Sequence, residues 1–265
     1  MNRVSEILKH NALKDSDSVL QEIRDPRRTS DRYNPIDHSG IIESFNQNNW
    51  FITEYQQVRP HKSDRSKYVH WLATYQNPDF EPAGVTAIPL ILHQGSHDGS
   101  KPFVLDFGLY NLKKLTSVVV GDKSFNSIIH KHVGSIPEKL EVGLALSTVF
   151  NNRQQILDTV HRMQTQTLAP PQMIDFVAKA VEYRFSPEKY SVQLGQVVGD
   201  SSGDIWSLLT QVQKVLIDAE ELKVTILASD ETRKAKYISN IESCISLKKN
   251  LWNLAISYLV EHSSV

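Results

Sequence analysis

The spacing of hydrophobic and polar positions changes twice along the chain. Between residues 50 and 132, apolar residues alternate with polar ones or form short β-branched and aromatic runs. These runs are FITEYQQV, KYVHWLATYQ, VTAIPLILHQ, PFVLDFGLYNL, LTSVVVG and FNSIIHKHV. Gly, Pro, Asp and Ser clusters separate them, which is typical of consecutive strands joined by turns. No segment of crossover-helix length lies between them, so the pattern predicts an antiparallel meander.

Helical spacing comes before and after this region. Residues 36–45 predict a short helix, with His38 or Ser39 near its start. After Gly134 we expect a helix following Pro137, a second from Pro170, a third capped by Asp204 or Ser202, and a fourth from about residue 232 to the C-terminus. The predicted fold class is α+β, with a central antiparallel β-meander and helices before and mainly after it.

The expected domain organisation follows from these changes. Residues 1–34 predict an N-terminal arm, which ends in the charged, proline-containing stretch RDPRRTSDRYNP. Residues 35–265 predict a single α+β domain, with the sheet over residues 50–133 and the helical part over residues 136–265.

Composition narrows the function classes. Lys and Arg number 29 and Asp and Glu 30, so a formal net charge of -1 gives no global attraction to nucleic acid or anionic lipid. The single cysteine excludes an internal disulfide and a cysteine-rich zinc cluster. Neither a secretory signal nor an apolar run of membrane-spanning length is visible. We therefore expect a cytoplasmic protein without membrane contacts.

The stretch LILHQGSHDGSKPFVLDF holds the first candidate site. Gly95 and Gly99 bracket Ser-His-Asp, so that the chain can turn with a positive φ as the tip of a hairpin requires, and Asp98 can accept a local backbone hydrogen bond. The alternative interpretation is a divalent metal site made by His93, His97 and Asp98 with His130 and His132, which share one face of another strand. Adjacent residues in a tight turn diverge, so a Ser-His-Asp catalytic triad is not expected. We predict no catalytic residues and no obligatory cofactor.

The segment YQQVRPHKSDRSKYVHW holds the second candidate site. Cations that follow phosphates, together with aromatic rings that stack on bases, are typical of single-strand binding. The candidate nucleic-acid-binding residues are Arg59, His61, Lys62, Arg65, Lys67 and Tyr68. The alternative is a solvated hairpin loop whose flanking aromatic residues belong to the core.

Several motifs occur in the order seen in a known family. They are SDRYNPID at 30–37, SHDGS at 96–100, FGLY at 107–110, KHVG at 131–134, DIWSLLTQVQKVLI at 204–217 and NLWNLAISYLVEH at 250–262. In these motifs the chain resembles the phage- and plasmid-associated family catalogued as domain of unknown function 932. The resemblance implies a mobile-element or phage setting and transfers no reaction.

The chain also departs from that family's pattern. Asn111 and LeuThrSerValVal follow the aromatic strand, where the family has an Arg and a Cys-Ser-Asn-Gly-like turn. Gln213, Lys214 and Val215 stand where the family has Gln-Glu-Asn. If these polar positions serve a site, the site is altered in this chain.

Three functional hypotheses follow. The leading one is a non-enzymatic protein of a phage, plasmid or other mobile element that binds or anneals single-stranded DNA as a homo-oligomer, because the predicted layout is similar to that of Rad52-type annealing proteins. The second is an interaction protein that modulates host defence by binding a host or phage protein. The third is a metal-dependent hydrolase that uses the His and Asp set.

Overall fold

The computed structural model describes residues 33–34, 36–58, 70–80, 87–112, 116–121, 127–131, 138–199 and 203–261. Contacts along the chain group it into two compact units. The first comprises Met1–Tyr110 with Ser124–Arg153, and the second comprises Asn111–Lys123 with Gln154–Val265. The predicted N-terminal arm lies outside the described residues except for Tyr33 and Asn34. The assignment of residues 35–265 to a single domain stays a prediction.

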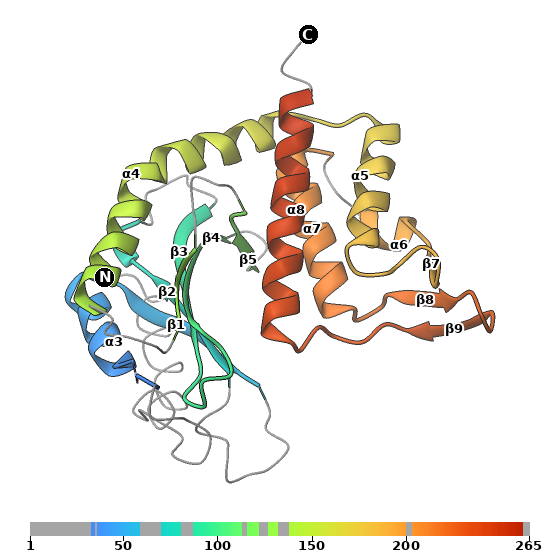
Figure 1. The fold of residues 1–265 in the computed structure, drawn as a ribbon. Coiled ribbons are helices and arrows are strands. Elements are labelled where there is room, and N and C mark those ends of the chain that lie inside the picture. Colours follow the sequence, from blue (N-terminus) through green and yellow to red (C-terminus); the bar gives the residue numbers. More distant parts are fainter. Residues whose placement is uncertain are drawn as a thin grey trace. The chain divides into compact units, whose positions relative to one another are not determined.

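The first unit contains helix α3 and most of an antiparallel sheet (Figure 1). The sheet has six strands in the order β1-β2-β3-β4-β5, with β6 paired to β4. The first unit holds α3 (His38–Gln47), β1 (Phe51–Gln57), β2 (Trp71–Gln76), a 3-10 turn (Pro78–Phe80), β3 (Ala87–Gly95), β4 (Phe103–Asn111) and β6 (Ile128–His130). Strand β5 (Thr116–Val119) belongs to the second unit. The α+β meander predicted from the sequence is therefore confirmed.

Register places alternate residues of this sheet on opposite faces. Strand β2 pairs antiparallel with β3 from Trp71↔Gly95 to Gln76↔Leu90. Because side chains alternate along a strand, Trp71 and Tyr75 of β2 share a face with His93 of β3. Helix α3 covers this face, since its Phe45 ring lies 4.5 Å from the ring of Tyr75.

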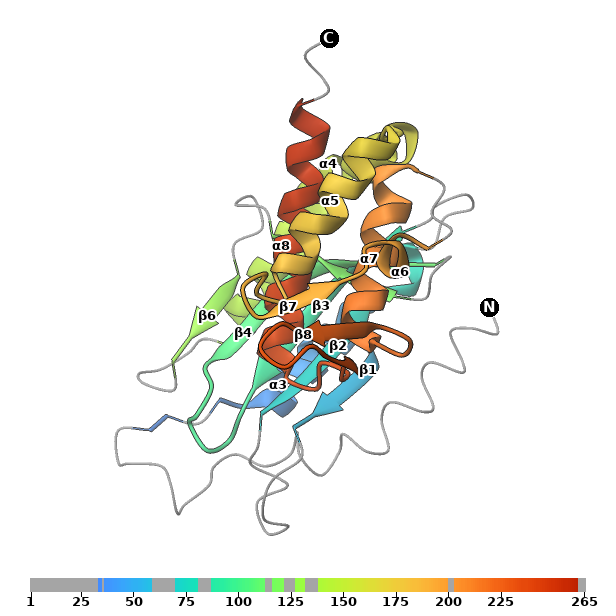
Figure 2. The same ribbon diagram turned by 90° about the vertical axis from the view of Figure 1, so that its right-hand side faces the viewer.

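The second unit contains helices and a small sheet. Helices α5 (Pro170–Glu182), α7 (Ile205–Asp218) and α8 (Ile241–Glu261) pack against one another, and Figure 2 shows them together. The short helix α6 (Gly195–Val198) packs on α7, and β5 contacts α7 and α8. The long helix α4 (Glu138–Thr165) belongs to the first unit up to Arg153 and to the second from Gln154.

Helix starts agree with the capping signals in the sequence. Asp37 caps α3 by accepting the backbone N–H of Gly40 at 3.0 Å. Asp204 caps α7, because its Oδ1 accepts the backbone N–H of Ser207 at 2.8 Å. Each cap satisfies a donor that has no partner within the helix. The helices predicted after Pro137, from Pro170 and from Asp204 are confirmed.

The predicted helix from about residue 232 is wrong over its first turns. A three-stranded sheet occupies this region, with β7 (Tyr190–Val192), β8 (Lys223–Ile226) and β9 (Glu231–Lys234) in the order β7-β8-β9. Asp230 has a left-handed φ of 54°, which closes the β8–β9 hairpin. Helix α8 begins only at Ile241. The side chain of Asn240 precedes it and accepts the backbone N–H of Ser243 at 2.9 Å. Hairpin pairing thus overrides the helical propensity of ThrArgLysAlaLys.

Within the described parts of the chain, no helix combines the length and the apolar character needed to cross a membrane.

Candidate functional site

Three buried histidines meet in the first unit, between α3 and the end of β3. His38 begins α3, His93 lies in β3, and His97 lies in the turn after it. The Nδ1 atom of His38 is 3.1 Å from Nε2 of His93. The ring centroid of His38 is 5.1 Å from that of His93 and 5.1 Å from that of His97. At most 1% of each residue is exposed. We call His38, His93 and His97 the histidine cluster.

Aromatic side chains surround the histidine cluster. The Trp71 ring lies edge-on to His38 at 4.8 Å and to His93 at 4.7 Å between centroids. The Phe103 ring lies 5.1 Å from that of His93. The hydroxyl of Tyr75 is 3.3 Å from Nδ1 of His93. The two nitrogens of His93 therefore face a phenol and a second imidazole inside an apolar enclosure.

Gly95 allows this close packing. A Cβ atom on Gly95 would lie 2.8 Å from Cε1 of His38, which is closer than real Cβ contacts allow, and 3.0 Å from Cζ2 of Trp71, which is tighter than most of them. Gly99, and not Gly95, provides the positive φ of the turn, at 68°. Asp98 accepts the backbone N–H of Ser100 at 3.0 Å, as expected for the tip of a hairpin. The sequence interpretation was therefore right for Gly99 and Asp98 and wrong for Gly95.

Burial sets the protonation of His93. Desolvation, with a smaller contribution from nearby His97, lowers the pKa of His93 from 6.5 to about 3. His93 is therefore neutral near pH 7, and one ring nitrogen donates while the other accepts. The contacts of neutral His93 with a second imidazole and with a phenol make a hydrogen-bonded core, and this packing role is what the geometry favours.

We expect the first unit to lose stability in mild acid. The folded pKa of His93 lies below its unfolded value of 6.5, so between these values the unfolded chain binds a proton that the folded chain does not. Above about pH 6.5 His93 is neutral in both states and causes no loss of stability. Each pH unit below that lowers the free energy of unfolding by about 1.4 kcal/mol. Urea unfolding between about pH 7 and pH 5 measures this slope.

Two variants identify the responsible group. His93→Gln does not titrate, so its unfolding free energy should fall less steeply with acid than that of the parent chain. His161→Gln removes an exposed histidine of α4 and should leave the slope unchanged. Equal slopes for His93→Gln and the parent would show that His93 is not the acid-sensitive group.

The other predicted metal ligands lie in different surroundings. His130 of β6 places its Nε2 3.0 Å from Oε1 of Glu141 in α4, an interaction that the sequence did not indicate. The Phe103 ring contacts both His130, at 6.1 Å, and His93, at 5.1 Å. His132 lies outside the described residues. Among the described side chains, no three His, Cys, Asp or Glu residues form a group that could hold a metal ion.

A second buried polar group lies on the opposite face of the sheet. Asp106 of β4 accepts from Nε2 of Gln94 at 2.9 Å and from the hydroxyl of Ser127. Asp106 is 2% exposed. Asp106 was not predicted from the sequence. The alternation along β4 is the signal that indicates it, because this carboxylate stands between Leu105 and Phe107 and faces the opposite side of the sheet.

The described ends of β1 and β2 frame the predicted nucleic-acid-binding segment. The two strands pair antiparallel as far as Gln57↔Trp71, and the N–H of Val58 donates to the carbonyl of His70 at 2.9 Å. Residues 59–69 thus connect the strands of one hairpin. The six predicted residues, Arg59, His61, Lys62, Arg65, Lys67 and Tyr68, lie outside the described residues.

A polar cluster joins β5 to α7 and α8 in the second unit. The Nε2 atom of buried Gln213 donates to Oγ1 of Thr116 at 3.2 Å and to the carbonyl of Ser117 at 2.8 Å. The Nζ atom of Lys248 donates to the hydroxyl of Ser117 at 2.7 Å. These bonds fix the short strand β5 to the helices.

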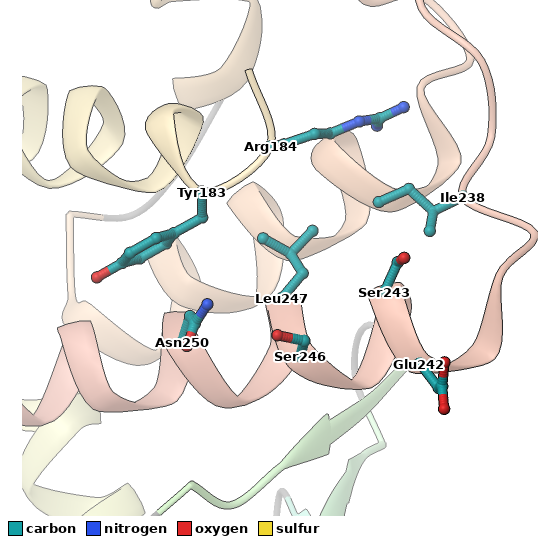
Figure 3. A pocket seen from close by; sticks show the side chains of 8 residues that line it. All are labelled: Tyr183, Arg184, Ile238, Glu242, Ser243, Ser246, Leu247 and Asn250. Carbon is teal, nitrogen blue, oxygen red and sulfur yellow. The ribbon is translucent and has the colours of Figure 1, made fainter. Parts of the chain in front are cut away.

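A groove of about 580 Å³ lies beside the first turns of α8 (Figure 3). Its rim carries the small polar side chains of Ser243, Ser246 and Asn250 and the half-exposed ring of Tyr183. Arg184 also lines it, and its guanidinium donates to the carbonyls of Leu216 and Lys236. Burial lowers the pKa of Arg184. The cation is therefore held by backbone oxygens of its own unit.

The fold defines an α+β protein built on an antiparallel meander. Residues 27–252 match the family described as Domain of unknown function (DUF932), and the chain belongs to this family. No curated protein and no solved structure matches the chain significantly. Two stretches singled out in the sequence, LeuThrSerValVal at 115–119 and the segment that begins at Gln213, meet in the polar cluster, where Gln213 bonds to Thr116 and Ser117.

Proposed function

We propose that this protein binds single-stranded nucleic acid without catalysing a reaction and that it promotes annealing of complementary strands. The setting that we propose is the cytoplasm of a cell that carries a phage or plasmid. The observation that carries the proposal is the β1–β2 hairpin, because the paired strands form a defined base for the basic segment between them.

Charge in this segment supports the proposal. Residues 59–69 include Arg59, Lys62, Arg65 and Lys67 and the single carboxylate Asp64, in a chain whose formal net charge is -1. A local excess of cations in a nearly neutral chain favours a local polyanion site over general attraction. Tyr68 lies within the same segment and can stack on bases of any sequence.

The histidine cluster supports the non-enzymatic part of the proposal. His38, His93 and His97 are buried among aromatic rings, and the Asp98 side chain accepts the backbone N–H of Ser100 within the turn. A general acid or base has to reach a substrate atom directly or through one water. Packing accounts for the burial of these histidines.

Fluorescence anisotropy with labelled oligonucleotides tests the proposed function. We expect the full chain to bind single strands more tightly than duplexes of the same sequence. Affinity should fall linearly on a logarithmic salt scale, with a slope of about -0.7 for each phosphate contacted. Absence of single-strand binding at low salt would contradict the proposal.

Binding to a host protein is the second candidate, and the groove beside α8 is the observation that favours it. Small hydroxyl side chains next to a half-exposed tyrosine leave room for an extended peptide segment. A pulldown with the chain and with Ser246→Arg, which fills the groove, tests it. Loss of one stoichiometric partner in the variant, with no nucleic-acid binding by the parent chain, would decide for this candidate.

A further inference from the structure

Strand β9 is the outer strand of the small sheet in the second unit. It pairs with β8 on one side and has no second neighbour among the described strands (Figure 1). All of its side chains, Glu231, Thr232, Arg233 and Lys234, are exposed. An exposed edge presents backbone donors and acceptors to any chain that can pair with it.

Hydrogen bonding shows which backbone groups of β9 face outward. The N–H of Ala235 donates to the carbonyl of Leu222 at 2.8 Å, so Ala235 faces β8. Residues of an antiparallel strand alternate between the two sides, so Arg233 also faces β8, whereas Thr232 and Lys234 direct their backbone groups to the open edge. The 2.9 Å contact between the Thr225 and Thr232 hydroxyls agrees, because side chains approach most closely in pairs that do not exchange backbone bonds.

The charges of β9 are poorly compensated inside its own sheet. Lys234 stands directly opposite Lys223 of β8, and like charges in that position are unfavourable. Oε1 of Glu221 is 3.7 Å from Nζ of Lys234, and both side chains are mostly exposed. Exposed pairs of this kind add little stability. Lys234 can therefore exchange Glu221 for another acid.

We propose that β9 pairs with β9 of a second copy of this chain, antiparallel and centred on Thr232. In this register Thr232 of each copy exchanges backbone hydrogen bonds with Thr232 of the other, because the N–H and C=O groups of Thr232 point to the open edge. Glu231 then stands opposite Arg233 of the second copy. The two-fold axis repeats this pair, so the edge is complementary to itself.

Neighbouring registers lack this complementarity. An antiparallel pair must shift in steps that keep outward residues opposite one another. One step in one direction places Glu231 opposite Glu231, and one step in the other places Arg233 opposite Arg233. Like charges directly opposite disfavour both. The sequence of β9 therefore selects one register and one partner, a second copy, independently of nucleic-acid binding.

Sedimentation of the full chain over a concentration series tests the proposal without nucleic acid. We expect a reversible dimer whose population rises with concentration. Arg233→Glu and Glu231→Arg should each weaken the dimer by roughly tenfold, because each replaces attraction by repulsion at both symmetry-related pairs. Lys214→Glu changes an exposed lysine of α7 by the same charge and should dimerise as the parent does.

Mixing the two variants gives the decisive result. A copy with Arg233→Glu carries acids at both positions 231 and 233, and a copy with Glu231→Arg carries bases at both, so only the mixed pair is complementary at these positions. We expect equimolar mixing to restore the dimer. A chain that stays monomeric at every concentration would overturn the proposal. A dimer that neither variant weakens, or a mixture that associates no better than the separate variants, would overturn it too.

Discussion

Replacing Arg59, Lys62 and Arg65 together by glutamate is expected to weaken single-strand binding by about a hundredfold or more at low salt. All three lie in the segment that connects β1 to β2. If each residue contacts one phosphate, binding of the variant releases fewer counterions. The slope of log affinity against log salt should then become shallower by about 2, because each of the three lost phosphate contacts accounts for about 0.7. Anisotropy over a salt series measures both quantities.

The control changes the same amount of charge in the second unit. Lys189, Lys214 and Lys223 are exposed, and their replacement by glutamate alters the net charge equally. We expect affinity within a few-fold of the parent, because general electrostatic attraction is weak for a chain of formal net charge -1. Equal losses in the two triple variants would show that net charge, and not the hairpin segment, governs binding.

The strands could be predicted from the sequence because each combines alternation with a flanking turn signal. β3 and β4 are separated by SerHisAspGlySerLysPro, and both appear where the apolar runs indicated. β8 and β9 could not be predicted in this way. ThrArgLysAlaLys has no apolar alternation, and β9 exists because it pairs with β8, where Val224 is buried. The local sequence pattern does not contain this pairing, which depends on the tertiary structure.

The histidine cluster was predicted only in part for a similar reason. The two-residue period of a strand placed His93 and His97 on one side of the chain. Their shared neighbour His38 comes from a helix 55 residues before His93, and no local pattern indicates that contact. Likewise, His130 was grouped with His93 by residue type, but Glu141 of α4 is its partner. Spacing gives the face of a strand, whereas packing between elements selects the neighbours.

Replacing Trp71 by alanine is expected to lower the free energy of unfolding of the first unit by about 3–5 kcal/mol. Trp71 is fully buried, and its ring contacts His38 and His93 edge-on and stacks on Tyr55 at 6.4 Å between centroids. Alanine leaves a cavity that Gly95, directly opposite in β3, has no side chain to fill. Urea unfolding followed by far-ultraviolet circular dichroism measures the loss.

Two further variants separate the cavity from a general effect of removing an aromatic ring. Tyr237→Ala removes a ring that is 54% exposed, and its unfolding free energy should stay within about 0.5 kcal/mol of the parent. Trp71→Phe keeps a ring between the histidines, so its loss should be smaller than that of Trp71→Ala. If Trp71→Ala cost no more than Tyr237→Ala, the aromatic enclosure would not stabilise the fold. The burial of His93, and the acid sensitivity that follows from it, would then need a different physical basis.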